Sequence, residues 1–258
     1  MKNKFLFTVI VTSLCLLVFI VKTFAQGEET FKVNRNGKLN IEISGGDIKV
    51  SSWDRNEVKV VYDDDSDKIR IKQTGNDIDV TSQDYLDFEI TVPSEYNLNL
   101  NTSGGDISVL NNIKGIVKIN TSGGDIKVKT VSGDLSVNTA GGNIDCDNIQ
   151  GDVKLTSSGG DIKVGTVEGE CKLSTGGGNI SVGNVSKNLN VSTGGGNVKS
   201  GNVGNDADIV TGGGNVSLDK VTGISSVTTG GGNVSGTVGR GGKITTGAGD
   251  VNLKNLSG

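Results

Sequence analysis

The sequence predicts an all-β protein, a single-chain β-solenoid with 18-residue coils and about nine regular coils. The first observation is a repeated marker, an Asp or Asn after a glycine-rich turn, whose nine copies are 17 to 19 residues apart. The second is that each copy holds two short segments in which aliphatic and polar residues alternate, as in half-buried strands. The third is that the same column is aliphatic in nearly every copy, as expected for coils stacked about 4.8 Å apart.

The two expected strands of a coil flank the marker. The first has aliphatic residues eight and six positions before it, such as Val153 and Leu155 before Asp161. The second has them one and three positions after it, such as Ile162 and Val164. The residues between them are mostly polar and are expected to point outward. The pattern therefore predicts an aliphatic core between two sheets of stacked strands.

Glycines occupy both bends of the expected coil. Triplets such as Gly194–Gly196 precede the marker, and the opposite bend uses Gly115, Gly133, Gly151 and Gly169. Stacked bends require either a positive φ or a close backbone approach, and glycine tolerates both. On this interpretation Gly195→Val destabilises the protein more than Ser192→Val does.

Two polar columns are expected to support the turns. The residue four positions before the marker is Thr in eight copies and Ser in one, and strand parity turns it inward, where its hydroxyl can bond the turn backbone. The marker side chains are expected to bond one another from coil to coil as an amide ladder. The structural ladder residues are Asn143, Asp161, Asn179, Asn197, Asn215 and Asn233.

Residues 26–100 are expected to form an N-terminal cap with the first irregular coils, before the regular repeats of residues 101–258. This segment contains the single Trp, the single Pro and all three Tyr of the chain, namely Trp53, Pro93, Tyr62, Tyr85 and Tyr96. Bulky residues gathered at one end indicate a wider, irregular cap that closes the first coil, where a bare solenoid would expose its core.

Residues 1–25 have the pattern of an export signal. Lys2 and Lys4 precede an apolar run of 17 residues from Phe5 to Val21, and the small residue Ala25 follows. We expect cleavage after Ala25, with an uncleaved membrane anchor as the alternative. No transmembrane segment is expected after the signal. The protein is therefore expected to be exported and to be periplasmic, at the cell surface or secreted.

Composition argues against catalysis and against nucleic-acid binding. The chain has no His, so the commonest general base and neutral metal ligand are missing. Without residues 1–25 it has 22 basic and 29 acidic residues, a net charge of −7. Phosphate binding needs clustered basic residues, which the chain lacks. We expect no enzymatic activity, no cofactor and no nucleic-acid partner.

A family resemblance rests on an ordered set of motifs. "LNIEISGGDIKVSSWDRNEVKVVY" is followed by "ITVP" and then by serial "SGGDIKV" copies. This order resembles the bacterial putative-adhesin β-solenoid family of envelope and secreted proteins, similar in style to head GIN-type auto-transporter adhesin-like domains. The resemblance covers residues 30–258. It implies a right-handed β-solenoid with an extracytoplasmic role, and it carries no catalytic residues over to this chain.

Asp106 and Asp125 are weak candidates for a calcium site, because they are adjacent acids in one stack. Repeats-in-toxin proteins, which this chain resembles in its glycines, Asp residues and 18-residue period, bind calcium through such turns. Five of the nine markers are Asn, however, which cannot supply the carboxylates that calcium prefers. The acidic loop Asp63–Asp67 is a second candidate. The alternative for both is a solvated acidic surface.

Cys146 and Cys171 are candidates for a disulfide. Both fall in inward columns, and the expected register makes them near-diagonal neighbours across the coil. Export would permit oxidation, and the geometry is compatible with the usual Cα spacing of a disulfide. The alternative is that each thiol replaces an aliphatic side chain as a small buried hydrophobe.

Two classes of function remain open from the sequence. The first is a non-enzymatic binding module of the bacterial cell envelope, whose extended polar faces contact a cell-surface glycan or protein. The second is a structural element that associates weakly with itself through the C-terminal end, where inward columns shrink to Ser225, Gly236 and Gly242. Binding to ice or crystal surfaces requires two outward ranks of Thr, whereas the expected Thr column faces inward.

Overall fold

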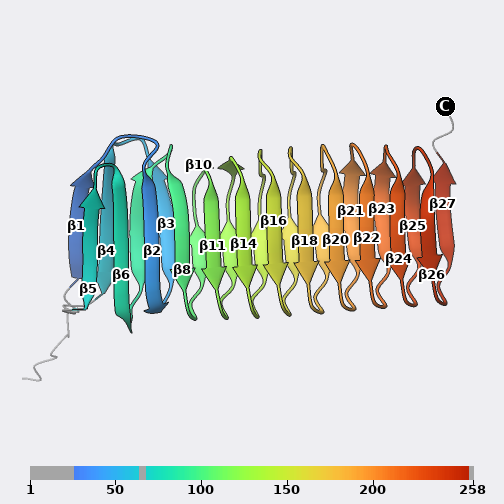
Figure 1. Cartoon of the computed structure of the whole chain (residues 1–258), viewed down its shortest axis with the longest axis horizontal. Coiled ribbons are helices and arrows are strands. Elements are labelled where there is room, and N and C mark those ends of the chain that lie inside the picture. The colour runs from blue at the N-terminus through green and yellow to red at the C-terminus, as the bar shows by residue number, and fades with distance from the viewer. Residues whose placement is uncertain (1–25, 64–67, 256–258) are drawn as a thin grey trace, which may run out of the picture.

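The computed structural model describes residues 26–63 and 68–255 and confirms the predicted all-β solenoid. Figure 1 shows a straight rod in which successive coils stack along the long axis. Within the described residues, two long sheets of 13 and 12 strands, here called sheet A and sheet B, face each other along the rod. The proposed export signal, residues 1–25, lies outside the described residues.

Sheet A contains the strands that follow the turn markers, together with β1 and β4 of the cap. Its order is β1 (Gln26–Lys32), β4 (Glu57–Asp63), β7 (Phe88–Pro93), β3 (Ile48–Trp53), β9 (Ile107–Val109), β12 (Ile126–Val128), β15 (Ile144–Cys146), β17 (Ile162–Val164), β19 (Ile180–Val182), β21 (Val198–Val203), β23 (Val216–Val221), β25 (Val234–Val238) and β27 (Val251–Asn255).

Sheet B contains the strands that precede the markers, together with β5 of the cap. Its order is β26 (Gly242–Thr246), β24 (Ser225–Thr229), β22 (Ala207–Thr211), β20 (Leu189–Thr193), β18 (Cys171–Thr175), β16 (Val153–Ser157), β14 (Leu135–Thr139), β11 (Val117–Thr121), β8 (Asn97–Thr102), β2 (Lys38–Gly45), β6 (Asp77–Tyr85) and β5 (Ile69–Thr74). A short third pair, β10 (Ile113–Lys114) and β13 (Val131–Ser132), continues through single bridges at the second bend.

The register of the stacked strands is the predicted 18-residue step. Val153 of β16 pairs with Cys171 of β18, and Ile162 of β17 pairs with Ile180 of β19. Each aliphatic column therefore runs from coil to coil, and its members are buried between the two sheets except in the last described coil. The residues between them, such as Lys163, point outward. Strand parity alone placed these side chains correctly, because a parallel register without slips keeps each column on one face.

The inward Thr column bonds to the turn backbone as predicted. Thr193 Oγ1 donates to the carbonyl of Gly178 at 2.8 Å, and the N–H of Gly196 donates to Thr193 Oγ1 at 3.2 Å. The same pair of bonds recurs at Thr211, which is likewise buried. One hydroxyl per coil thus satisfies two buried backbone groups at each turn.

In the triplet Gly194–Gly196, the first and last glycines allow a close backbone approach, and the middle glycine is sterically unconstrained. A Cβ on Gly196 would lie 1.9 Å from the carbonyl oxygen of Gly178, and one on Gly194 would lie 2.0 Å from that of Gly176. At Gly195 a Cβ would meet nothing within 4 Å, and its φ is outside the left-handed region. The expectation that Gly195→Val is disruptive is therefore wrong, because the steric constraint belongs to the two neighbours.

The coils at the N-terminal end are not stacked in sequence order. β2 pairs with β6 on one side and with β8 on the other, so the β6–β7 coil lies outside the β2–β3 coil that precedes it in the chain. β1 and β4 add antiparallel strands to sheet A, and β5 adds one to sheet B. In Figure 1 the blue and teal strands accordingly interleave at this end.

The bulky residues of this end divide between core and surface. Phe88 and Tyr96 are completely buried, and Trp53 is half-buried with its indole N–H donating to the carbonyl of Glu57 at 2.8 Å. The side chain of Tyr85, in contrast, is 72% exposed. It therefore does not contribute to closing the core.

Candidate functional site

The marker side chains form a continuous ladder, but the donor differs from the predicted one. The backbone N–H of each marker donates to the Oδ1 of the marker one coil earlier, for example Asn215 to Asn197 at 2.8 Å. The amide of Asn197 adds a longer bond to Asn179, at 3.3 Å. Because Asp and Asn both present an Oδ1 acceptor, they interchange freely along this column. The ladder runs through Asp87, Asp47, Asp106, Asp125, Asn143, Asp161, Asn179, Asn197, Asn215, Asn233 and Asp250.

Asp106 and Asp125 serve as rungs of this ladder. The N–H of Asp125 donates to Asp106 Oδ1 at 2.8 Å, and the N–H of Asn143 donates to Asp125 Oδ1 at 2.7 Å. Within residues 26–63 and 68–255, no group of three or more His, Cys, Asp or Glu side chains comes together as metal ligands would. Of the acidic loop Asp63–Asp67, residues 64–67 lie outside the described part.

Cys146 and Cys171 are both free and buried, so the disulfide considered from the sequence is absent from the structure. Cys146 belongs to β15 of sheet A and stacks on Val164, whereas Cys171 belongs to β18 of sheet B and stacks on Leu189. Burial raises the pKa of both thiols. Each cysteine therefore fills the place of an aliphatic residue in its column.

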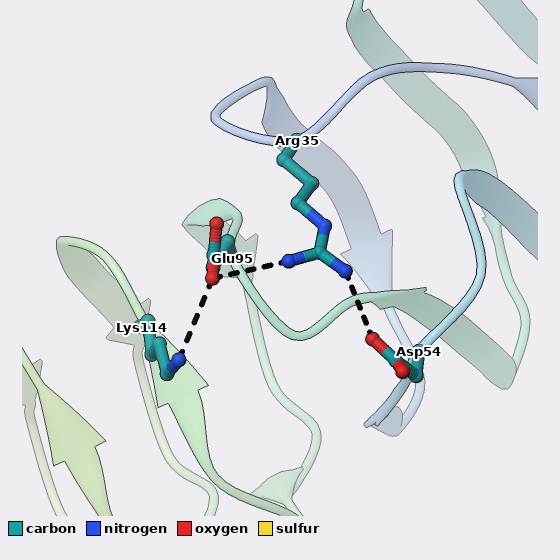
Figure 2. A network of polar contacts seen from close by, with 4 residues as sticks. All are labelled: Arg35, Asp54, Glu95 and Lys114. Atoms are coloured by element: carbon teal, nitrogen blue, oxygen red, sulfur yellow. Dashed lines mark hydrogen bonds and ion pairs between the residues drawn. The ribbon is translucent and has the colours of Figure 1, made fainter.

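A network of charged side chains ties the cap to the first regular coils. Arg35 bridges Asp54, at 3.0 Å, and Glu95, at 3.3 Å, and Lys114 reaches the same Glu95 at 3.4 Å (Figure 2). Arg35, Asp54 and Glu95 lie in separate connections between strands, and Lys114 is the last residue of β10. Their charges are paired within the network, which connects the cap to the first regular coils.

A hollow of 540 Å³ on the outer face of sheet B, at the cap, is the best candidate for a binding site. It lies where β6 carries one extra residue against β2, since the register shifts between Ile43 and Gly45. Such a bulge locally redirects side chains and opens the surface. We call this feature the cap hollow; its lining residues are Glu42, Ile43, Ser44, Lys68, Arg70, Thr81, Ser82, Gln83 and Ser103.

The polar groups of the cap hollow come from adjacent strands. Arg70 of β5 pairs in register with Thr81 of β6, and Glu42 of β2 pairs with the same Thr81 from the other side. Arg70 and Glu42 therefore flank Thr81 at a separation of about two strand spacings, roughly 9–10 Å. Lys68 forms an ion pair with Asp84 at 2.7 Å, and this contact raises the pKa of the Lys68 ammonium.

An exposed aromatic ring lies beside the cap hollow. Tyr85 pairs with Gly45, and a Cβ on Gly45 would lie 2.3 Å from the Tyr85 ring, so the glycine makes room for the ring. The Tyr85 hydroxyl donates to the carbonyl of Gly104 at 3.5 Å. Gly45 and Gly104 directly follow Ser44 and Ser103 of the hollow. The ring thus lies over two turn glycines that are next in sequence to lining residues of the hollow, and most of its surface faces solvent.

The cap hollow was not predicted from the sequence. Four of its residues, Arg70, Thr81, Ser82 and Gln83, belong to the β5–β6 hairpin, whose two-residue turn at Gly75 and Asn76 has Gly75 at a φ of 62°. A "TGND" turn between two alternating segments is a recognisable hairpin signal, so the hairpin could have been predicted from the sequence. The hairpin pairs with β2, about 40 residues away, and this spacing does not follow the 18-residue period, so the pairing could not be predicted from the repeat.

The described part of the chain, residues 26–63 and 68–255, contains no helix with the length and apolarity needed to cross a bilayer. Its surface is built of strand faces and bends. Those faces are mostly polar, with isolated exposed aliphatic residues such as Val210 and Ile224.

Comparison with known proteins identifies the family. A putative adhesin from Parabacteroides distasonis ATCC 8503 is similar with a TM-score of 0.50 and 12% identity, over 91% of this chain and 98% of that chain. A putative adhesin from Bacteroides fragilis NCTC 9343 has a TM-score of 0.40 and 16% identity, over 90% of this chain and 97% of that chain. A putative lipid binding protein from Parabacteroides distasonis ATCC 8503 has a TM-score of 0.43 and 12% identity, over 90% of this chain and 97% of that chain.

No curated protein matches the sequence. The Toastrack DUF4097 family matches residues 36–186, which is more than half of the chain. This segment includes the out-of-order coils of the cap and the first regular repeats. The resemblance read from the sequence motifs is thereby confirmed, and the chain belongs to the Toastrack DUF4097 family.

Proposed function

We propose that the protein is an exported, non-enzymatic binding module of the bacterial cell envelope, adhesin-like, that contacts a cell-surface glycan or protein. The observation that carries this proposal is the outer face of sheet B, which repeats polar side chains in register from coil to coil. Asn101, Asn120 and Asn138 there form an amide ladder, with Nδ2 to Oδ1 distances of 2.8 and 3.0 Å. Further along, Thr156 and Ser174 continue the same column.

Such a face suits weak contacts that add up over a long surface. Equivalent side chains recur about every 4.8 Å, so a repetitive or extended partner meets the same groups many times. The core behind the face is fully packed, and the side chains are held in rows by the sheet. The Parabacteroides structure that shares this fold is itself named a putative adhesin, which supports the same class of function for this chain.

Export is tested by locating the protein in the cell. We expect it in extracytoplasmic fractions, with Gln26 as its first residue after cleavage behind Ala25. Retention in the cytoplasm with an intact N-terminus at Met1 would contradict export, whereas an intact N-terminus in the membrane fraction would mean that residues 1–25 act as an anchor.

Binding is tested with the labelled mature protein on intact bacterial cells. We expect saturable binding that periodate treatment of the cells removes if the partner is a glycan, and that protease treatment removes if it is a protein. Periodate cleaves vicinal diols and leaves most of the polypeptide surface in place. Binding to no cell surface under any of these conditions would contradict the proposal.

A second candidate function is self-association through the C-terminal end of the rod. The outer edges of β26 and β27 have no strand partner among the described residues, so their backbone groups can template another strand. Light scattering on a size-exclusion column distinguishes the two candidates. A mass that rises with protein concentration favours the scaffold, and a constant monomer mass excludes it.

A further inference from the structure

We propose that the cap hollow is a binding site for a neutral saccharide, with the Tyr85 ring as the stacking surface and Arg70, Gln83 and Glu42 as the groups that bond its hydroxyls. This inference rests on the proposed binding function and names the partner class and the site for it. It draws on four features: the shape of the hollow, its hydrogen-bonding groups, its charge balance and the exposed Tyr85 ring over the neighbouring turn glycines.

The shape fits a small ligand. A volume of 540 Å³ lies within the range of roughly 300–1,000 Å³ typical of small-molecule sites. The concavity lies at the bulge in β6 opposite Ile43 and Gly45, and all of its lining residues except Lys68 and Ser103 belong to the paired strands β2, β5 and β6. The remainder of sheet B lacks this bulge between its parallel strands, and its outer face follows the regular register from β8 to β26.

The lining groups match the hydrogen bonding of a sugar. Hydroxyl groups of a saccharide both donate and accept, and the hollow offers both kinds of partner. Arg70 supplies donors, Glu42 supplies acceptors, and the Gln83 amide supplies one of each. The hydroxyls of Ser44 and Ser103 complete the lining. Arg70 and Glu42 stand on opposite sides of Thr81, so a ligand between them can bond to both at once.

The charges of the hollow favour a neutral ligand. Among the described residues, Arg70 and Glu42 take part in no ion pair, while Lys68 is paired with Asp84. One free cation and one free anion therefore face the ligand together. These two charges cancel, so a charged ligand gains no net electrostatic attraction from them, whereas a neutral ligand can bond to both groups.

The position of Tyr85 provides the second, independent observation. The ring is 72% exposed, whereas Phe88 and Tyr96 of the same cap are buried. Its placement depends on Gly45, because a Cβ there would lie 2.3 Å from a ring carbon. An aromatic face is electron-rich and attracts the weakly positive C–H groups that line one face of a sugar ring. A ring held open beside a polar hollow is therefore suited to stack on a bound sugar.

The same residues do not form a hydrolytic site. Glycoside hydrolysis requires two carboxyl groups about 5–9.5 Å apart on either side of the bond. Glu42 is the carboxylate that lines the hollow, and the nearby Asp84 is occupied by Lys68. The arrangement binds a saccharide and leaves it intact.

The experiment is a titration of the mature, isotope-labelled protein with defined oligosaccharides, followed by NMR. The probes are a neutral set (malto-, manno- and N-acetylglucosamine oligomers), an acidic set (oligogalacturonate and sialyllactose) and a mixed tetrapeptide library. We expect a neutral oligosaccharide to shift the amide signals of Gly45, Tyr85 and Gly104 and to show saturation transfer from the protein. Shifts with acidic sugars alone, with peptides alone or with none of the probes would overturn the inference.

Variants separate the site from the rest of the molecule. Tyr85→Ala and Arg70→Ala are each expected to weaken binding at least about tenfold, and Tyr85→Phe is expected to bind nearly as well as the wild type. Lys72→Ala is the matched control, because Lys72 is an outward cation two residues along β5, opposite Asp79 and outside the hollow. Equal effects of Arg70→Ala and Lys72→Ala would show a general charge effect and contradict the site.

Gly45→Ala tests the placement of the ring without deleting it. The new Cβ displaces the Tyr85 ring, an exposed side chain that can move at little cost, so saccharide binding should fall while the Tm stays within a few degrees. If Tyr85→Ala, Arg70→Ala and Gly45→Ala bind cells as well as the wild type does, the assignment of the saccharide site is wrong, while the proposed binding function stands. If the wild type binds no cell surface, the proposed function fails first.

Discussion

At the scale of single residues, the residue type in each column of the turn has its own physical explanation. The glycine directly before the marker is required because the backbone one coil earlier approaches to within 2 Å of where its Cβ would lie, as at Gly196. A Cβ on the middle glycine would meet no other atom within 4 Å at Gly195, and the last repeat carries Ala248 at that place. The marker supplies an Oδ1 acceptor, and the Thr column supplies a hydroxyl that both donates and accepts.

A pair of alanine substitutions tests this division. Gly196→Ala should lower the free energy of unfolding by about 1–3 kcal/mol, because its Cβ overlaps the backbone carbonyl of Gly178, which cannot move without disturbing the stack. Gly195→Ala should change stability by no more than about 0.5 kcal/mol. Thermal or denaturant unfolding measures both. Equal losses for the two variants would mean that the triplet acts through chain flexibility.

The two cysteines allow a second test at this scale. We expect the mature protein, unfolded in guanidinium without reductant, to release two thiols to Ellman's reagent, because Cys146 and Cys171 are free in the fold. In the native protein both should react far more slowly, since burial raises the pKa of each thiol and keeps the thiolate population low. A count of zero thiols after unfolding would establish the disulfide.

At the scale of the element, the coil is defined by inward aliphatic residues and outward polar ones. Ile162→Asp should unfold the middle of the rod, because an unpaired buried carboxylate costs several kcal/mol and Ile162 is completely enclosed by its column. Lys163→Ser is the matched control. It removes only an exposed ion pair with Asp145 at 3.6 Å, and Ser181 already stands at the same position one coil later.

The measurement is thermal unfolding followed by circular dichroism. We expect a large fall in Tm, or no folded protein, for Ile162→Asp and a shift within a few degrees for Lys163→Ser. Similar shifts for the two variants would contradict the strand parity on which every column assignment depends.

The regular coils could be predicted from the sequence because each residue pairs with the residues one period, about 18 positions, before and after it. Asn197 must meet Asn179 and Asn215 if each coil steps by 18 residues, and one marker fixes the register of the whole coil. The sequence of the cap contains no such regular period. "LDFEIT" around Asp87 repeats the alternation of "GDIKVS" around Asp47 but lacks the glycines, so the sequence does not reveal that β6–β7 stacks outside β2–β3. The cap hollow depends on that stacking and was missed with it.

At the scale of the whole molecule, the rod has two unlike ends. At one end the antiparallel strands β1, β4 and β5 extend the sheets beyond the first coils. At the other, the described strands finish with β26 and β27, each hydrogen-bonded on one side. The ladder is directional as well, because each Oδ1 accepts from the next coil; within the described residues Asp250 is the last rung.

This asymmetry predicts a gradient of local stability. In β26 and β27 no side chain is fully buried, and Val251 is 48% exposed; in the preceding strand β25, Gly236 contributes no side chain to its column. Few buried apolar contacts and one-sided hydrogen bonding lower the free energy of local opening. Hydrogen exchange should therefore find the amides of residues 235–255 far less protected than those of residues 120–200, where each strand is paired on both sides. Strong protection of residues 235–255 in a purely monomeric sample would contradict the gradient, and protection that grows with protein concentration would instead support end-to-end assembly through β26 and β27.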